Sequence, residues 1–181
     1  MWHPLEYFSP GTLGWLLLAL MAFAIVLYLR LQSLGRRLRN GMAPLGIVSL
    51  EMCLSSEESR GIIDSWDDDA REDARRLLCL DYFFIPVYTT AIAVVGVMAS
   101  RWFTERGLTS LGTIAIVLAW GQWVAGLFDF TENSALLRIL SMYPDIPDGL
   151  SLLAGWSARI KFLLIIMAVL CCLFGLVTSL T

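Results

Sequence analysis

Residues 107–128 read GLTSLGTIAIVLAWGQWVAGLF, an apolar stretch without one charged side chain. A helix needs about 20 such residues to cross the ~30 Å hydrocarbon core of a bilayer. Three further uncharged apolar stretches occur in the chain, at Thr12–Leu29, Tyr82–Ser100 and Phe162–Leu180. None of them shows the period-two alternation of a membrane β-barrel strand. The sequence therefore predicts an all-α, polytopic membrane protein built as a bundle of four transmembrane helices.

The composition favours the same fold class. Hydrophobic residues make up 57% of the 181 residues and charged residues only 16%, whereas a typical soluble domain has roughly 25% charged residues. A domain of this size has too little interior to hide so much apolar surface from water. We therefore expect a single membrane domain over residues 1–181, with spans at about 12–31, 80–100, 107–130 and 159–180.

The distribution of Lys and Arg predicts an orientation. Residues 1–11 hold none, the first and third connections between spans together hold eleven, and the second connection holds two. Because cytoplasmic loops carry the excess of Lys and Arg, we expect both termini outside and both longer connections in the cytoplasm. The absence of basic residues from 1–11 also argues against a cleaved signal peptide. With a net charge of −3 and no basic run, nothing indicates binding to nucleic acid.

The cysteines and the single histidine restrict the possible cofactors. No C-x-x-C pair occurs among Cys53, Cys79, Cys171 and Cys172, and the only histidine is His3. A structural zinc site needs four closely spaced Cys or His ligands. We therefore expect no zinc, no haem with two histidine ligands and no other cofactor. Cys171 and Cys172 are predicted to be small core residues, and His3 is predicted to lie at the surface.

The first connection predicts an additional cytoplasmic amphipathic helix over about residues 56–79. Ser55 and Glu58 have the spacing of a capping box, and apolar residues behind them recur at helical spacing opposite a charged face. This helix is expected either to lie on the membrane surface or to run directly into the second span. The preceding run, Leu45–Leu54, contains Glu51 and is too short to span, so we expect a re-entrant or interfacial segment.

A stripe of small and polar residues marks one face of the third span. Its members are three or four residues apart, so they lie along one side of a helix. Small residues let membrane helices approach closely, and an amide can hydrogen-bond to a neighbouring helix. We expect this stripe to face the bundle; it comprises Gly112, Ala115, Ala119, Gln122, Gly126, Asp129 and Asn133. A similar stripe on the fourth span comprises Lys161, Leu164, Ala168, Cys171, Gly175 and Thr178.

The stripes and the topology together predict a polar cluster just inside the cytoplasmic interface. The second and fourth spans begin on that side and the third span ends there, so their terminal polar residues should lie at one depth. Ionisable groups at such a depth are costly and are usually paired or functional. The candidate ligand-binding residues are Glu51, Asp81, Tyr88, Gln122, Asp129, Glu132, Asn133 and Lys161, with Tyr88 and Gln122 one or two turns deeper.

Two interpretations of this cluster are open. In the first, Lys161 pairs with Asp129 or Glu132 and only fixes the bundle. In the second, the cluster is a ligand site, because carboxylates outnumber the one lysine and three polar groups share a single turn. An excess of carboxylates suits a cation, the cationic headgroup of a lipid or amphiphile, or a shared proton that raises the pKa of one carboxyl group.

Two short motifs, L-D-x-x-F-x-x-x-Y at 80–88 and F-D-x-x-E-N at 128–133, resemble small bacterial integral membrane proteins of four helices. The resemblance covers residues 45–180. It implies a four-helix fold and a location in the bacterial cytoplasmic membrane. No activity is assigned to such proteins, so the resemblance implies no reaction.

The sequence leads to two functional hypotheses. The first is a protein that binds a membrane lipid, an amphiphile or a cation at the carboxylate cluster; were it also an enzyme, a carboxylate would act as general acid or base. The second is a non-catalytic accessory subunit of a larger membrane complex, or a homo-oligomer. The residues do not decide between a binding site and a catalytic one.

Overall fold

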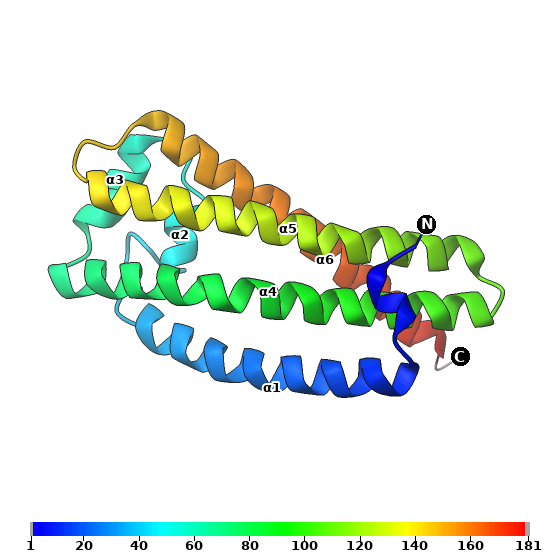
Figure 1. Cartoon of the computed structure of the whole chain (residues 1–181). Helices are drawn as coiled ribbons and strands as arrows, with labels where there is room; N and C mark the ends of the chain where they lie inside the picture. The colour runs from blue at the N-terminus through cyan, green and yellow to red at the C-terminus, as the bar shows by residue number, and fades with distance from the viewer. Residues whose placement is uncertain (1, 180–181) are drawn as a thin grey trace. The chain divides into compact units, whose positions relative to one another are not determined.

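The computed structural model describes the backbone of residues 2–179 and the side chains of residues 2–175 (Figure 1). This part of the chain is helical and contains no strand. One short 3-10 helix and six α-helices follow one another along it: η1 Pro4–Tyr7, α1 Pro10–Gly35, α2 Ile47–Glu51, α3 Ser56–Asp64, α4 Asp68–Glu105, α5 Thr109–Met142 and α6 Asp148–Ser179.

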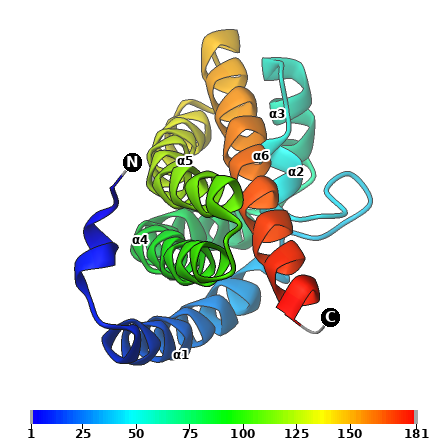
Figure 2. The same cartoon turned by 90° about the vertical axis from the view of Figure 1, so that its right-hand side faces the viewer.

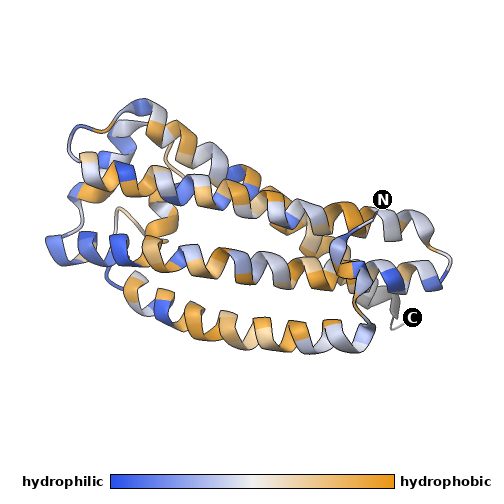
Figure 3. Ribbon diagram, in the orientation of Figure 1, coloured by the Kyte–Doolittle hydropathy of each residue, from blue (hydrophilic) through white to orange (hydrophobic). Residues whose placement is uncertain are grey.

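Four of these helices, α1, α4, α5 and α6, are long and apolar enough to cross a membrane. The predicted fold class is confirmed to that extent. Hydrophobic residues dominate α1, whereas the first turns of α4 are hydrophilic (Figure 3). With 38 and 34 residues, α4 and α5 extend well beyond the predicted spans at 80–100 and 107–130.

The chain divides into two compact units. Unit 1 comprises Met1–Ala24, Pro86–Gly126 and Lys161–Thr181, and unit 2 comprises Ile25–Ile85 and Leu127–Ile160. Each unit has its own core of buried apolar side chains. The core of unit 1 draws on η1, α1, α4 and α5, and the core of unit 2 draws on every α-helix from α2 to α6.

Within unit 1, α4 and α5 pack closely side by side (Figure 2). A Cβ atom placed at Gly96 would lie 3.2 Å from the Cβ of Ala119. One placed at Gly112 would lie 2.5 Å from Oγ1 of Thr104. Larger side chains at these glycines would force the two helices apart, so the small residues set the distance between them.

The turn between α4 and α5 depends on Gly107. Its φ of 78° is in the left-handed region, which favours glycine. The amide of Leu108 donates to the carbonyl of Phe103 at 2.9 Å, and that of Gly107 donates to Thr104 at 3.0 Å. These two bonds form the Schellman arrangement that ends a helix and satisfies its last carbonyls.

Residues 2–8 are held against α4 and α5 in unit 1. The indole Nε1–H of Trp120 donates to the carbonyl of Trp2 at 3.0 Å. The guanidinium of Arg101 donates to the carbonyls of Glu6 and Phe8, at 2.6 and 2.9 Å. Backbone groups of a short segment are thus bound by side chains that come about 100 residues later.

His3 is completely buried in this segment, so the expectation of a surface position is wrong. The segment folds back onto α5, where the His3 ring centroid lies 4.9 Å from that of Trp120 and 4.7 Å from that of Trp123. Its Nδ1 accepts from the amide of Leu5, while its Nε2 is buried without a hydrogen-bond partner. Removal from water lowers the pKa of His3, although the Glu6 carboxylate acts in the opposite direction.

In unit 2, the predicted helix over 56–79 is divided in two. The chain turns between α3 and α4 at residues 65–67. The turn is anchored by Trp66, whose buried indole Nε1–H donates to the carbonyl of Leu38 at 2.9 Å. From Asp68 the helix continues without interruption to Glu105. Of the two expected arrangements, this is the one in which the helix runs directly into the second span.

Side-chain caps begin both helices. The hydroxyl oxygen of Ser55 accepts from the amide of Glu58 at 3.2 Å, so the predicted N-cap of α3 is confirmed. The Glu58 carboxylate accepts from the amide of Leu54 at 2.9 Å, one residue before the position used in a capping box. At the start of α4, Asp67 accepts from the amide of Ala70 at 2.7 Å.

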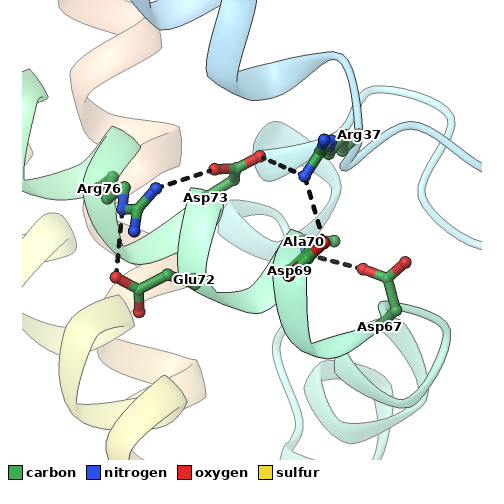
Figure 4. A network of polar contacts seen from close by, with 7 residues as sticks. All are labelled: Arg37, Asp67, Asp69, Ala70, Glu72, Asp73 and Arg76. Carbon is green, nitrogen blue, oxygen red and sulfur yellow. Dashed lines mark hydrogen bonds and ion pairs between the residues drawn. The ribbon is translucent and has the colours of Figure 1, made fainter.

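A network of charged residues covers the start of α4 (Figure 4). Arg37, which follows α1, lies 3.5 Å from the carboxylate of Asp69 and 3.7 Å from that of Asp73. Arg76 pairs with Glu72 at 3.2 Å and with Asp73 at 3.8 Å. Exposed ion pairs of this kind stabilise by no more than about 1 kcal/mol each. Their main effect is to keep this end of α4 hydrophilic.

Elsewhere in unit 2, α6 passes very close to the segment between α2 and α3. A Cβ atom at Gly155 would overlap the carbonyl of Cys53 and lie 2.8 Å from Leu54 Cδ2. One turn further along α6, the guanidinium of Arg159 donates to the carbonyl of Met52 at 3.0 Å. Glycine is therefore required at 155 for α6 to reach this position.

We predict that Gly155→Ala lowers the free energy of unfolding by about 1–3 kcal/mol, because a backbone carbonyl cannot move aside for the added methyl group. Gly149→Ala on the same helix is the matched control, since no atom lies within 4 Å of the added Cβ. There, alanine should be neutral or stabilise by up to about 1 kcal/mol. Thermal unfolding of both variants in one detergent measures the difference; equal melting temperatures would contradict the prediction.

The lowered pKa of His3 predicts that the protein loses stability as the pH falls below 6.5. In that range the unfolded chain binds a proton at His3 and the folded chain does not, so protonation favours unfolding. His3→Gln removes this titration. The stability advantage of the wild type over His3→Gln should therefore shrink between about pH 8 and about pH 5, measured by denaturant unfolding in detergent. A constant or growing advantage would refute the assignment.

Candidate functional site

The predicted stripe on α5 faces inward along its whole length. All seven of its members are buried, which confirms that prediction. In unit 1, the Gln122 amide donates to the carbonyl of Leu164 on α6 at 3.1 Å, which is the expected bond to a neighbouring helix. Lys161, Ala168 and Gly175 of the α6 stripe are buried too, and the side chain of Thr178 lies outside the described residues.

The stripe ends in unit 2 with a buried polar turn, which comprises Asp129, Glu132 and Asn133. These side chains are 3%, 0% and 1% exposed. Their spacing of three and four residues puts them on one face of α5. The Asn133 amide donates to the carboxylate of Asp81 on α4 at 2.8 Å. The structure thus brings Asp81 to the polar turn, as the sequence predicts.

Sequence reasoning missed the contacts that flank this bond in unit 2. The hydroxyl oxygen of Tyr82 lies 2.7 Å from that of Ser134. The Tyr82 ring stacks on the Phe130 ring, with 5.5 Å between the ring centroids. Arg75 of α4 donates to the carbonyl of Leu140 on α5 at 2.9 Å. The sequence contains one indication of the contact between Tyr82 and Ser134. Tyr82 directly follows Asp81, and Ser134 directly follows Asn133, so a bond between Asp81 and Asn133 also brings their neighbours close together.

Burial of the carboxylates in the polar turn is energetically demanding. An ionised carboxylate loses several kcal/mol or more on leaving water unless it gains a partner. Asp129 and Glu132 both have interaction partners, and so does Asp81. Carboxylate oxygens only accept hydrogen bonds while ionised, whereas an amide also donates. Chemically, the polar turn can accept bonds from an ammonium or hydroxyl group, or retain a proton.

Glu51 lies at the end of α2 and is 8% exposed. The adjacent Leu50 belongs to the core of unit 2. The run Leu45–Leu54, expected to be re-entrant or interfacial, thus contributes a short helix to the core of unit 2. The carboxylate of Glu51 has an interaction partner. Its membership of one site with the polar turn stays a prediction.

The other three candidate residues belong to unit 1. Tyr88 is half-buried on α4, and Gln122 is completely buried on α5. The carbonyl oxygen of the Gln122 side chain has no hydrogen-bond partner. Lys161 is buried on α6, at the first residue of the portion of that helix that belongs to unit 1. Its Nζ lies 4.8 Å from the ring centroid of Phe162. That these residues share a site with the carboxylates stays a prediction.

Among residues 2–179, no group of three or more His, Cys, Asp or Glu is arranged to hold a metal ion. In comparisons with known proteins, no protein-family model, no curated protein and no solved structure matches the chain. The assignment of a function therefore depends on the residues and on the geometry described above.

We predict that Asn133→Ala lowers the free energy of unfolding by about 1–3 kcal/mol, because the partly buried carboxylate of Asp81 loses its amide donor. Thr131→Ala is the matched control on the same helix. Thr131 is exposed and bonds only to the carbonyl of Leu127 in its own helix, so its loss should change stability by less than about 0.5 kcal/mol. Denaturant unfolding in detergent compares the two, and equal effects would disprove the role of the bond.

Proposed function

We propose that this protein is an integral membrane protein whose buried polar turn binds the cationic headgroup of a lipid or amphiphile, or a free cation. Its location in the membrane is supported by α1 and α6, which leave most of their apolar surface exposed. In their most apolar stretches only 11% and 22% of the residues are buried. Leu18 on α1 and Leu170 on α6 are about three-fifths exposed. Hydrocarbon stabilises such surfaces, whereas water does not.

Helix length supports a defined depth for the polar turn. At ~1.5 Å per residue, α4 is about 57 Å long and α5 about 51 Å, while the hydrocarbon core is ~30 Å thick. Measured from their shared turn at Gly107, about 20 residues of each helix fill the core. Asp129, 22 residues from Gly107, then falls at its far edge, and Asp81, 26 residues from Gly107, lies one to two turns beyond that edge, where the hydrophilic first turns of α4 enter water.

The same arrangement favours a cytoplasmic position for the polar turn. The connections on its side of the membrane carry eleven of the thirteen Lys and Arg residues, and such loops face the cytoplasm. Both termini are then outside. The bacterial cytoplasmic membrane is the location that the two short motifs imply.

The observation that carries the proposed binding activity is the burial of Asp129 and Glu132, at 3% and 0% exposure, in a helix of membrane-spanning composition. Bundles seldom place two carboxylates and an amide on one turn, because nonpolar residues would pack at lower cost. Glu51 and Asp81 add two further acids to unit 2. A positively charged headgroup complements this excess of acids. If catalysis occurs, one carboxylate would act as general acid or base.

The exposed face of α1 favours a second candidate, an accessory subunit without chemistry of its own. Large apolar side chains such as Trp15 and Leu18 are exposed on it, and a neighbouring protein would cover them as well as lipid does. Purification in a mild detergent separates the two. A larger partner in fixed stoichiometry would support the accessory subunit, whereas a monomer or homodimer would count against it.

We predict that Asp129→Asn abolishes co-purification of a cationic lipid or amphiphile while the protein still folds. The amide keeps the size of the carboxylate and removes its charge, so binding driven by charge should fall at least tenfold. Asp145→Asn is the matched control, because this exposed residue lies in the loop between α5 and α6. Native mass spectrometry of the three proteins measures bound ligand, and circular dichroism measures helix content.

Two results would overturn the proposed site. In the first, Asp129→Asn retains the same bound molecules as the wild type. In the second, Asp129→Asn no longer yields folded protein while the wild type carries no ligand. The second result would assign the polar turn to the structural pairing that the sequence also allows.

A further inference from the structure

Unit 1 contains an apolar groove that is separate from the polar turn. Its volume is about 560 Å³, within the ~300–1,000 Å³ of typical ligand sites. One wall is a stripe of α4 that includes Ile92, Val95 and Trp102. The opposite wall is formed by α6, with Cys172 and Leu173, and Leu17 of α1 also lines the groove.

The groove is elongated along α4. From Ile92 to Trp102 it follows about 15 Å of the helix at ~1.5 Å per residue. It ends one turn before Glu105, the last residue of α4. Under the topology proposed above, this end lies at the outer membrane interface, where tryptophan is enriched. The groove thus runs from the interface into the hydrocarbon layer.

The positively charged side chain of Arg106 lies at the interfacial end of the groove. The guanidinium carbon of Arg106 lies 3.7 Å from the ring centroid of Trp102, the same side chain that lines the groove. Arg101 contributes a second positive charge on the same end of α4, although its guanidinium already donates to two backbone carbonyls. The acids of this region are Glu105, which is exposed, and Glu6, which accepts from the amide of His3.

A flexible hydrocarbon chain fits an open apolar groove of this volume. An apolar channel with a cation at its interfacial end matches a molecule that has an anionic head and a hydrocarbon tail.

We infer that this groove binds one acyl chain of an anionic phospholipid, with the lipid phosphate at Arg106. The guanidinium donates to phosphate oxygens while it remains stacked on Trp102, and the chain covers Val95 and Leu173. This inference rests on the proposed location in a membrane. It does not depend on the polar turn, since every residue involved belongs to unit 1.

Phosphatidylglycerol, titrated into the detergent-solubilised protein and followed by native mass spectrometry, tests the groove. The wild type should bind one molecule saturably. Val95→Trp fills the groove and should weaken binding at least tenfold. Leu18→Trp, an equally large side chain on the exposed face of α1, should bind like the wild type. Arg106→Gln should weaken binding roughly tenfold, because a charged donor to phosphate is lost.

Photo-crosslinking of the unmodified protein provides a second measurement that does not depend on the folding of a variant. Phosphatidylglycerol with a photoactivatable group in its acyl chain should label peptides containing residues 92–102 and 169–175. Labelling spread evenly over α1, or equal binding by Val95→Trp and Leu18→Trp, would overturn the inference. So would a dimer that Val95→Trp disrupts, or unchanged binding by Arg106→Gln. None of these variants alters unit 2, so failure here is distinguishable from failure of the polar turn.

Discussion

The close approach of α4 and α5 is the constraint on which the other features depend. In unit 1, Gly96 and Gly112 bring the backbone of each helix against the other. In unit 2, the same two helices are joined by the bond from Asn133 to Asp81. Without hydrophobic driving force inside a bilayer, association depends on such close packing and on interhelical hydrogen bonds. Larger side chains at the glycines would weaken both contributions.

The polar turn can be buried because α5 is organised as one continuous stripe. Small residues and Gln122 occupy the stripe through unit 1, and Asp129 and Asn133 extend it in unit 2, with the buried Glu132 beside them. Positions that would otherwise be packed with leucine hold carboxyl groups instead. Since a charge removed from water is stable only with a partner, the polar turn has a cost that packing alone would avoid. That cost is the reason to look for a ligand rather than a purely structural role.

The sequence was most informative where a periodic pattern coincided with a strong physical preference. The inward direction of Gln122 and Asn133 followed from helical spacing, because one buried member of a stripe fixes the rest. The break at Trp66 could not be predicted, since the indole bond to Leu38 joins residues that are distant in sequence. His3 was misplaced for the same reason, as its environment is made by Trp120 and Trp123. The groove depends on how three helices are spaced, which no local pattern records.

The attachment of residues 2–8 has a consequence for biosynthesis. Their backbone carbonyls are held by Arg101 and Trp120, which the ribosome adds about 100 residues later. Until then this segment can have no final position, although α1 behind it has already been synthesised. Synthesis of the first helix and attachment of the segment that precedes it are therefore separate events in time. The segment is seated only after the hairpin of α4 and α5 has been made.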